Sequence, residues 1–261
     1  MAGPILLAET RDGVATIRLN RPDVHNAFDD ALIAELTGAL RAVAAESDVR
    51  AVVLAAAGKS FSAGADLNWM RRMAGASIVE NEADARALAD LMRTLRDLAK
   101  PTVAVVQGPA YGGGVGLVAA CDIAIAADSA TFALSEVRLG LIPAVVSPYV
   151  IAAIGARAAR RYFLTGERFG AAEALRLGLV HSVVPADQLE QTLGEVVAAL
   201  REGGPLAQAA AKRLVADVAG RPIDAALAAE TARRIAEIRA GAEGKEGVGA
   251  FLDKREPAWR R

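Results

Sequence analysis

Three short apolar runs constrain the fold of this chain more than any other feature. They are AVVLAA (51–56), PTVAVVQG (101–108) and DIAIAAD (122–128), and each has the length of one strand. A continuous apolar run of this length is typical of a strand that is covered on both faces, as in a parallel sheet. The runs alternate with small-residue loops and helical patterns, so the sequence predicts an α/β fold with parallel pairing.

Other elements follow from periodicity and turn residues. ILLAET and VATIRLN flank residues 11–13, where Asp-Gly favours the tight turn of a hairpin. Apolar residues recur at helical spacing from Asp29 to about residue 45, with Asp29 or Asp30 available as the N-cap. A charged helix is expected over 78–98, and another, over 115–120, directly after a run of glycines.

The chain beyond Pro143 is expected to be mostly helical, apart from a short strand near 179–184. Its last ~60 residues form Ala-rich amphipathic segments that are separated by glycines at 203–204, 220 and 241–244. We therefore expect a body over 1–200 and a helical region over 201–261 that packs between subunits.

Composition excludes several classes of protein. Apolar residues make up 53%, but no stretch approaches the ~20 residues of a membrane span, so we expect a soluble protein. A net charge of -1 gives no global attraction to nucleic acid or to an anionic membrane. The first residues lack the pattern of a secretory signal, which favours the cytoplasm. The single cysteine, Cys121, excludes an intrachain disulfide and a Cys-based zinc cluster.

The unusual residues lie in three loops, at 58–70, 107–122 and 132–143. In the second loop, Gly112, Gly113 and Gly114 open a helix, and free N–H groups there would face the positive end of its dipole. A dinucleotide-binding fingerprint fails because Leu117 stands where its last glycine belongs. Judged alone, the glycines fit either an oxyanion site or close helix packing.

The segment SFSAGAD (60–66) forms a second loop of small residues. Two such turns after separate buried strands can supply two converging N–H donors, which is what an acyl oxyanion needs in a water-poor site.

Six segments together resemble the ordered motifs of the enoyl-CoA hydratase/isomerase (crotonase) superfamily. They are LNRPDVHNAF, SFSAGADL, GPAYGGGVGLVAACDIAIA, SEVRLGLIP, LTGERFGAAEALRLGLV and FLDKREP, and they span residues 20 to 257. The resemblance implies a crotonase-like spiral of ββα units with a helical C-terminal trimerisation region. It also implies an acyl-CoA thioester substrate, a homotrimer or a hexamer of two trimers, and no separate cofactor, because coenzyme A belongs to the substrate.

The resemblance also implies roles for individual residues. The N–H groups of Ala65 and Gly113 would form the oxyanion hole around the thioester carbonyl, and Glu136 would be the catalytic acid/base. The backbone that recognises the adenine would lie near Ala63, Asp66 and Leu67. The cations expected near the CoA phosphates are Lys59, Arg21 and Lys254. Further expected substrate contacts are Asn68, Gly112, Gly116 and Tyr111, and Tyr111 and Trp69 are candidates for lining the acyl pocket.

Two features depart from the family pattern. Typical hydratases of this family carry a second glutamate two residues beyond the glycine run, where this chain has Gly116. In addition, AVVSPYVIAAIG after Pro143 replaces a stretch that is usually glycine-rich. We expect the room at Gly116 to accommodate substrate bulk or a substrate carboxylate.

Three functions are compatible with this pattern. The first is hydration of a branched or carboxylated enoyl-CoA such as 3-methylglutaconyl-CoA, since SEVRLGLIPAVVSPYV resembles hydratases of that group. The second is a Δ3,Δ2-enoyl-CoA isomerase in which Glu136 alone moves a proton between C2 and C4. The third is a noncatalytic acyl-CoA-binding paralogue.

Other chemistries fit poorly. Only two histidines, His25 and His181, exist, no G-x-S-x-G elbow is present, and we expect both rings at loop or strand-edge positions. No His, Cys and acid residues recur at metal-ligand spacing. Asp122, directly before a strand, is expected to be a turn or capping group rather than a second catalytic acid.

Overall fold

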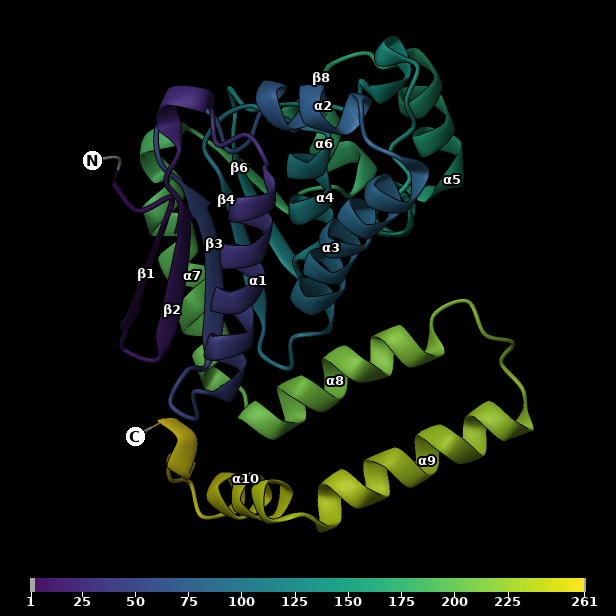
Figure 1. Ribbon diagram of the computed structural model, residues 1–261. Helices are drawn as coiled ribbons and strands as arrows, with labels where there is room; N and C mark the ends of the chain where they lie inside the picture. Colours follow the sequence, from purple (N-terminus) through teal and green to yellow (C-terminus); the bar gives the residue numbers. More distant parts are fainter. Residues whose placement is uncertain (1–2, 261) are drawn as a thin grey trace.

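The computed structural model describes residues 3–260. The first two residues of the expected body (1–200) and the last residue of the expected helical region (201–261) lie outside the described residues. A six-stranded sheet in the order β1-β2-β3-β4-β6-β9 forms the centre of the body (Figure 1). Within this sheet the β1–β2 pair is antiparallel, and the neighbouring pairs β2–β3, β3–β4, β4–β6 and β6–β9 are parallel. The strands are β1 Leu6–Arg11, β2 Val14–Leu19, β3 Ala51–Ala56, β4 Thr102–Val106, β6 Ile123–Ala127 and β9 Ser182–Val184.

The central strands are buried on both faces, as their apolar runs predict. Every residue of β3 and β4 is buried, and successive side chains alternate between two apolar clusters. Leu54 faces the cluster beneath α1 (Asp30–Ala45) and α3 (Ile78–Asp97), whereas Val53 faces α7 (Leu189–Glu202). Since burial of one such side chain stabilises by roughly 1.5–3 kcal/mol, the sandwiched strands anchor the fold.

Local signals fix the helix starts in the same body. The Asp29 carboxylate accepts a hydrogen bond from the Leu32 N–H at 2.8 Å and caps α1, so Asp29 rather than Asp30 is the cap. Ser77 and Glu80 form a reciprocal capping box at the start of α3. The remaining body helices are α2 Leu67–Ala74, α4 Gly113–Ala120, α5 Ser147–Thr165 and α6 Ala171–Leu177.

A second, three-stranded sheet was not predicted. It consists of β5 (Ala110–Tyr111), β7 (Thr131–Ala133) and β8 (Phe169–Gly170). Strands of two or three residues are too short to show an alternating pattern, which explains why the sequence does not reveal them. The expected helix over 115–120 also begins earlier, at Gly113, directly after β5.

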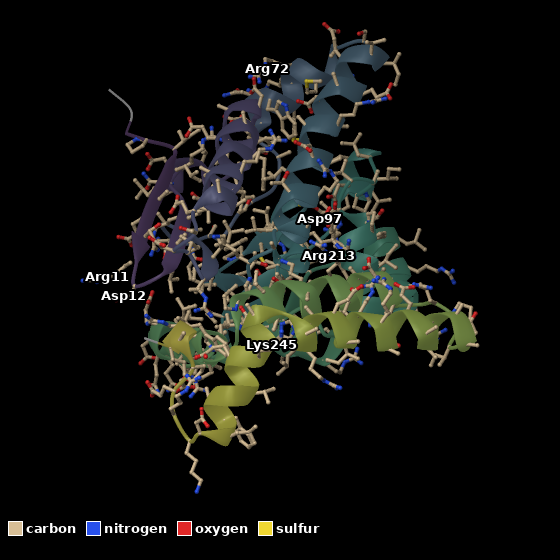
Figure 2. All side chains as sticks on the ribbon, turned by 90° about the horizontal axis from the view of Figure 1, so that it is seen from below. Arg11, Asp12, Arg72, Asp97, Arg213 and Lys245 are labelled. Atoms are coloured by element: carbon tan, nitrogen blue, oxygen red, sulfur yellow. The ribbon has the colours of Figure 1, made fainter. Side chains whose placement is uncertain are left out.

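Three helices extend below the body: α8 (Pro205–Val218), α9 (Ala225–Ala240) and α10 (Ala242–Leu252). Lys212 on α8 pairs with Asp122 at 2.7 Å and ties this region to the start of β6. Figure 2, seen from below, shows α8 and α9 lying across this end of the molecule, with side chains of both charge signs interspersed. Among the helices within residues 3–260, none is long and apolar enough to cross a membrane.

We predict that Asp29→Ala lowers the free energy of unfolding by about 1–2 kcal/mol, because α1 loses its cap. Asp29→Asn is the matched control, since an asparagine keeps the capping oxygen and removes only the charge. Thermal unfolding at one protein concentration measures both variants. Equal destabilisation by the two substitutions would show that the ion pair of Asp29 with Arg21, and not the cap, carries the effect.

Candidate active site

Backbone hydrogen bonds join the two small-residue loops directly. The Ser62 N–H donates to the Pro109 carbonyl at 3.1 Å, and the Tyr111 N–H donates to the Ser62 carbonyl at 2.8 Å. Gly64 has φ +89°, and a Cβ there would lie 3.2 Å from the Tyr111 carbonyl oxygen. The loop after β3 and the loop after β4 therefore meet backbone to backbone.

The pairing of the first loop with Phe28 leaves one amide unused. The Phe28 N–H donates to the Gly64 carbonyl at 2.7 Å, and the Asp66 N–H donates to the Phe28 carbonyl at 2.8 Å. Ala65, which lies between Gly64 and Asp66, takes no part in these two hydrogen bonds. Within residues 3–260 the Ala65 N–H has no hydrogen-bond partner, and Ala65 is exposed.

The second loop presents another unused amide at the start of α4. Gly112 has φ +50° and donates its N–H to the Ala133 carbonyl at 2.9 Å, which turns the chain into the helix. Gly113 is the first helical residue, and no atom of the described chain accepts its N–H. A Cβ at Gly114 would lie 2.9 Å from Ser62. The glycines thus serve close packing and also leave a donor at the positive end of a helix dipole.

Glu136 lies against this second loop. It begins a short 3-10 helix, Glu136–Leu139, and its Oε1 lies 3.1 Å from the position of a Cβ at Gly112. Its Oε2 is buried and has no hydrogen-bond partner among the described residues. Burial raises the pKa of the Glu136 carboxyl above its ordinary value, and a hydrogen bond from its own backbone N–H offsets this only in part.

The three features meet at one place. The Cβ position at Gly112 that lies 3.1 Å from Glu136 Oε1 is also 3.8 Å from the Gly64 Cα. Each of these two glycines immediately precedes an unpartnered amide, at Ala65 and at Gly113. Two free N–H groups and one carboxylate with raised pKa therefore lie around a single small region.

Asp66 is a structural residue of this loop. Its carboxylate accepts from the N–H groups of Asn68 at 2.8 Å and Trp69 at 3.2 Å and caps α2. Burial acts to raise the pKa of Asp66, but these hydrogen bonds and the charge of Arg21 outweigh it and leave the pKa below its usual value. In the same loop Ala63, Ala65 and Leu67 are exposed, whereas the residues between them, Gly64 and Asp66, are buried. Asn68, which follows Leu67, is also exposed.

Arg21, whose expected contact with the CoA phosphates stays a prediction, has several partners within the fold. Its guanidinium pairs with Asp29 at 2.9 Å and Asp66 at 3.2 Å and donates to the Ala27 carbonyl at 2.5 Å. The side chain is 16% exposed. Because two carboxylates already neutralise it, Arg21 fixes the loop and offers no free charge to a phosphate.

The other two expected cations differ in position. Lys59 is exposed on the loop that precedes Ala63, beside the candidate site. Lys254 follows the end of α10, at the opposite end of the molecule from α2 (Figure 1). The expected contact of Lys254 with the CoA phosphates stays a prediction.

Gly116 leaves no room, contrary to expectation. A Cβ at this position would lie 2.3 Å from Val146 Cγ1 and 3.1 Å from Met92 Cε. Val146 is 3% exposed. The side chain of Val146 fills the space in which we expected substrate bulk or a substrate carboxylate.

The two aromatic candidates have partners in the fold. The Tyr111 hydroxyl hydrogen-bonds with Thr131 at 3.0 Å, and the Arg168 guanidinium carbon stacks 5.1 Å above its ring. Trp69 is buried and donates its indole N–H to Asp84 at 2.8 Å. Trp69 thus packs α2 on α3.

The minor candidates have the structural roles expected of them. His25 Nδ1 lies 3.0 Å from the Ser60 hydroxyl, and His181 Nδ1 accepts the Ala124 N–H at 3.1 Å. Asp122 accepts from the Thr102 N–H at 2.8 Å and pairs with Lys212, so it is a capping group. Cys121 is buried, and burial raises the pKa of its thiol to about 12. The described chain has no group of three or more His, Cys, Asp or Glu residues that could hold a metal ion.

Asn26 is a positioning residue that the sequence analysis missed. It is fully buried with φ 53°, and its amide donates to the carbonyls of Ala57 and Ser60 at 2.8 Å each. The backbone carbonyl oxygen of Asn26 accepts a hydrogen bond from the Ser62 hydroxyl at 2.9 Å. Asn26 lies inside the segment LNRPDVHNAF, but only the fold shows that it holds the 57–62 loop in place.

Comparison with known proteins finds similarity over nearly the whole chain. An enoyl-CoA hydratase from Shewanella pealeana is 46% identical, with a TM-score of 0.96 over 98% of this chain and 96% of that one. Pseudomonas aeruginosa AtuE is 42% identical, with a TM-score of 0.93 over 99% and 100%. The 2,3-dehydroadipyl-CoA hydratase of Escherichia coli is 32% identical over 257 residues, 98% of each chain. The enoyl-CoA hydratase/isomerase family model matches residues 9–261, so this chain belongs to that family and has the crotonase fold.

Proposed function

We propose that this protein hydrates an α,β-unsaturated acyl-CoA thioester, or runs the reverse dehydration, through an oxyanion-stabilised enolate. The observation that carries the proposal is the grouping of the free N–H groups of Ala65 and Gly113 with the half-buried carboxylate of Glu136. The similarity to enoyl-CoA hydratases over nearly the whole chain supports the choice of substrate class.

The two amides would supply the largest catalytic effect. When both donate to the thioester carbonyl oxygen, C3 of the enoyl group becomes electrophilic and negative charge collects on that oxygen. Removal of one such donor in other enzymes costs about 2.7–4 kcal/mol of transition-state stabilisation. The amides cost little reorganisation, because the hydrogen bonds of Gly64 and Gly112 already hold both loops.

Glu136 would move the proton in both halves of the reaction. Its carboxylate accepts a proton from water while the water oxygen bonds to C3, and the C2–C3 π electrons pass into the enolate. The protonated Glu136 then returns the proton to C2, the carbonyl re-forms, and the net change is addition of one water. Burial raises the pKa of this carboxyl, which makes it a stronger base than an exposed glutamate.

We further propose that the acyl group is branched or carboxylated, as in 3-methylglutaconyl-CoA. The segment SEVRLGLIPAVVSPYV supports this proposal by its resemblance, and the name of the Escherichia coli relative specifies a dicarboxylic acyl group. The filled space at Gly116 removes the steric argument for it. An electrostatic argument remains, because a site with one carboxylate repels an anionic acyl group less than a site with two.

A second candidate function is supported by the same single carboxylate. A Δ3,Δ2-enoyl-CoA isomerase needs only one group that takes a proton from C2 and returns it to C4. A noncatalytic acyl-CoA-binding paralogue is the third candidate and predicts binding without turnover.

Mass measurement separates the three candidates. We expect purified protein incubated with crotonyl-CoA, 3-methylglutaconyl-CoA and a 3-enoyl-CoA to add the mass of one water, about 18 units, to at least one of the 2-enoyl thioesters. Unchanged mass with conversion of the 3-enoyl thioester would identify the isomerase. Binding without conversion on the whole panel would identify the paralogue.

Glu136→Gln tests the assigned base. We expect kcat/KM for hydration to fall about 10²- to 10⁴-fold, the range that general acid–base catalysis contributes. In the wild type, kcat/KM should fall as pH decreases through a pKa above the ordinary 4.5 of a glutamate, because the ionised form is the base. Undiminished hydration by the variant would exclude Glu136 from proton transfer.

The same variant has a stability readout that does not depend on turnover. A carboxyl whose folded-state pKa is raised contributes stability below its unfolded pKa and loses it as pH rises through the folded pKa. Glu136→Gln should therefore unfold at a higher temperature than the wild type at pH 8, with a smaller difference near pH 4.

We also propose that the chain forms a homotrimer or a dimer of trimers. Large apolar side chains are exposed in the C-terminal region at Ile223 (97%), Phe251 (82%) and Leu252 (71%), and such surfaces mark protein interfaces. Light scattering should give three or six times the 27.0 kDa of one chain. Phe251→Lys should shift the protein to smaller species. Leu7→Lys, on the edge strand β1, is the control and should not. A wild-type protein that is a monomer would contradict the proposal.

A further inference from the structure

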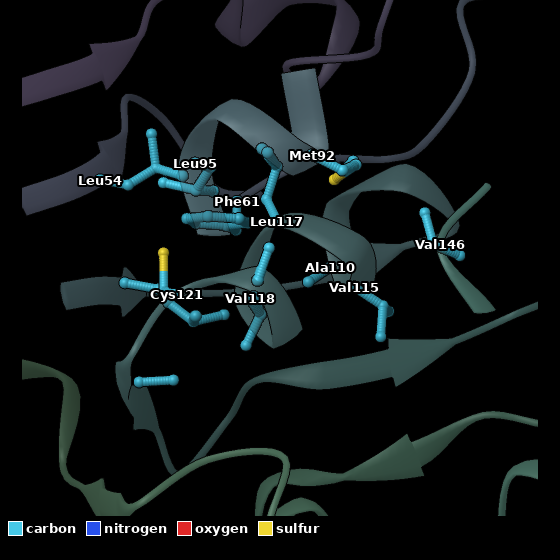
Figure 3. Packing of buried hydrophobic residues seen from close by; sticks show 14 of the residues in the cluster. Leu54, Phe61, Met92, Leu95, Ala110, Val115, Leu117, Val118, Cys121 and Val146 are labelled. Atoms are coloured by element: carbon cyan, nitrogen blue, oxygen red, sulfur yellow. The ribbon is translucent and has the colours of Figure 1, made fainter. Parts of the chain in front are cut away.

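The two departures from the family pattern are in contact in the structure. One is Gly116 on α4, and the other is the segment after Pro143, which includes Val146 at the N-cap of α5. A Cβ at Gly116 would lie 2.3 Å from Val146 Cγ1 and 2.8 Å from Val146 Cβ. Figure 3 shows Val146 and Met92 among the buried side chains around α4. A side chain absent from the helix is thus replaced by one from the facing loop.

This contact lies close in sequence to the turn that faces the Glu136 carboxylate. Gly112 is the N-cap of α4, and Gly116 lies four residues further on, in the first turns of the helix. Glu136 Oε1 faces the Cβ position of the first, and Val146 faces that of the second. The segment 136–146 therefore has one end against the N-cap of α4 and the other end against the helix itself.

The contact is rigid enough to exclude a side chain at position 116. Val146 is buried, and its β-branched side chain has little rotamer freedom. Real Cβ atoms do not approach other heavy atoms to 2.3 Å, and the nearest atoms here belong to the body of the side chain rather than to a flexible end. Met92 can adjust, whereas Val146 cannot withdraw without moving the segment that carries Glu136.

We propose that Val146 is a specificity-determining residue of this site. By filling the place above Gly116, Val146 puts an apolar side chain where a second carboxylate would stand. Glu136 is then the only carboxylate that the described residues place there, and the site accepts an acyl group that itself carries a negative charge. This inference rests on the proposed hydratase function and adds the residue that sets the charge tolerance of the site.

The physical consequence concerns charge rather than volume. Two like charges several ångströms apart in a partly buried site repel each other, and water screens them less there than at an open surface. A carboxylate at position 116 would therefore oppose both the ionisation of Glu136 and the binding of a carboxylated acyl chain. With Val146 in its place, no charge of another acid within residues 3–260 contributes to the raised pKa of Glu136, and burial is its leading cause.

The contact itself is tested by thermal unfolding of Gly116→Ala, Val146→Ala and the double variant. We expect Gly116→Ala to lower Tm, and the double variant to have a higher Tm than the sum of the two single shifts predicts. Gly38→Ala on α1 is the matched control, because a Cβ there meets nothing within 4 Å and alanine favours helix. Additive shifts, or a Gly116→Ala variant as stable as Gly38→Ala, would overturn the inference.

The charge role is tested by Gly116→Glu/Val146→Gly, with Gly116→Gln/Val146→Gly as the uncharged control of equal size. The measured quantity is the ratio of kcat/KM for 3-methylglutaconyl-CoA to that for crotonyl-CoA. We expect the glutamate variant to lower this ratio on the order of tenfold relative to the glutamine variant. We also expect it to change the single ionisation of the pH profile to two. Equal ratios in the two variants would overturn the charge role.

Failure of this inference and failure of the proposed function can be told apart. The unfolding measurements need no turnover, so they decide the Gly116–Val146 contact even if the wild type hydrates nothing. Wild-type hydration combined with additive Tm shifts would leave the proposed function intact and remove Val146 from its role.

Discussion

The backbone contact between the loop at 62–66 and the strand–helix turn at 109–114 is the constraint on which the rest of the site depends. The backbone N–H of Ser62 donates a hydrogen bond to this turn, and its carbonyl accepts one from it. Gly64 and Gly114 allow the two segments to approach more closely than a side chain at either position would permit. Since the parallel order of β3 and β4 delivers both loops to one edge of the sheet, the fold supplies the approach and the glycines make it close. The free amides of Ala65 and Gly113 follow from this registration.

The site holds polar groups in a state that the remainder of the fold must stabilise. The Glu136 Oε2 is buried and has no hydrogen-bond partner within residues 3–260, and a carboxyl with a raised pKa opposes folding at neutral pH. The unpartnered amide at the start of α4 is likewise a donor that water or substrate must satisfy. Such conflicts are typical of functional sites, where activity requires groups that are not already satisfied by the protein. The buried strands and their two apolar clusters supply the compensating stability.

Much of the fold and of the site could be predicted from sequence because the signals are local. A continuous apolar run identifies β3, Asp29 caps α1, and three successive glycines indicate that a helix follows them, although α4 begins two residues earlier than expected. The failures concern contacts between distant segments. Arg21 looks like a free cation in the sequence, yet Asp66, which neutralises it, is 45 residues away. The three-stranded second sheet has elements of two or three residues, which carry no periodic pattern at all.

Gly116 shows why an absent side chain cannot be equated with free space. The sequence shows a glycine where related hydratases carry a glutamate, and from that position alone a cavity is the natural expectation. Protein interiors are close-packed, so a lost side chain is usually replaced by another one from elsewhere. Here the replacement, Val146, comes from the segment that begins with Glu136, which couples the shape of the site to the placement of its base. The two departures from the family pattern are therefore in contact with each other, and a change at one of them alters the packing of the other.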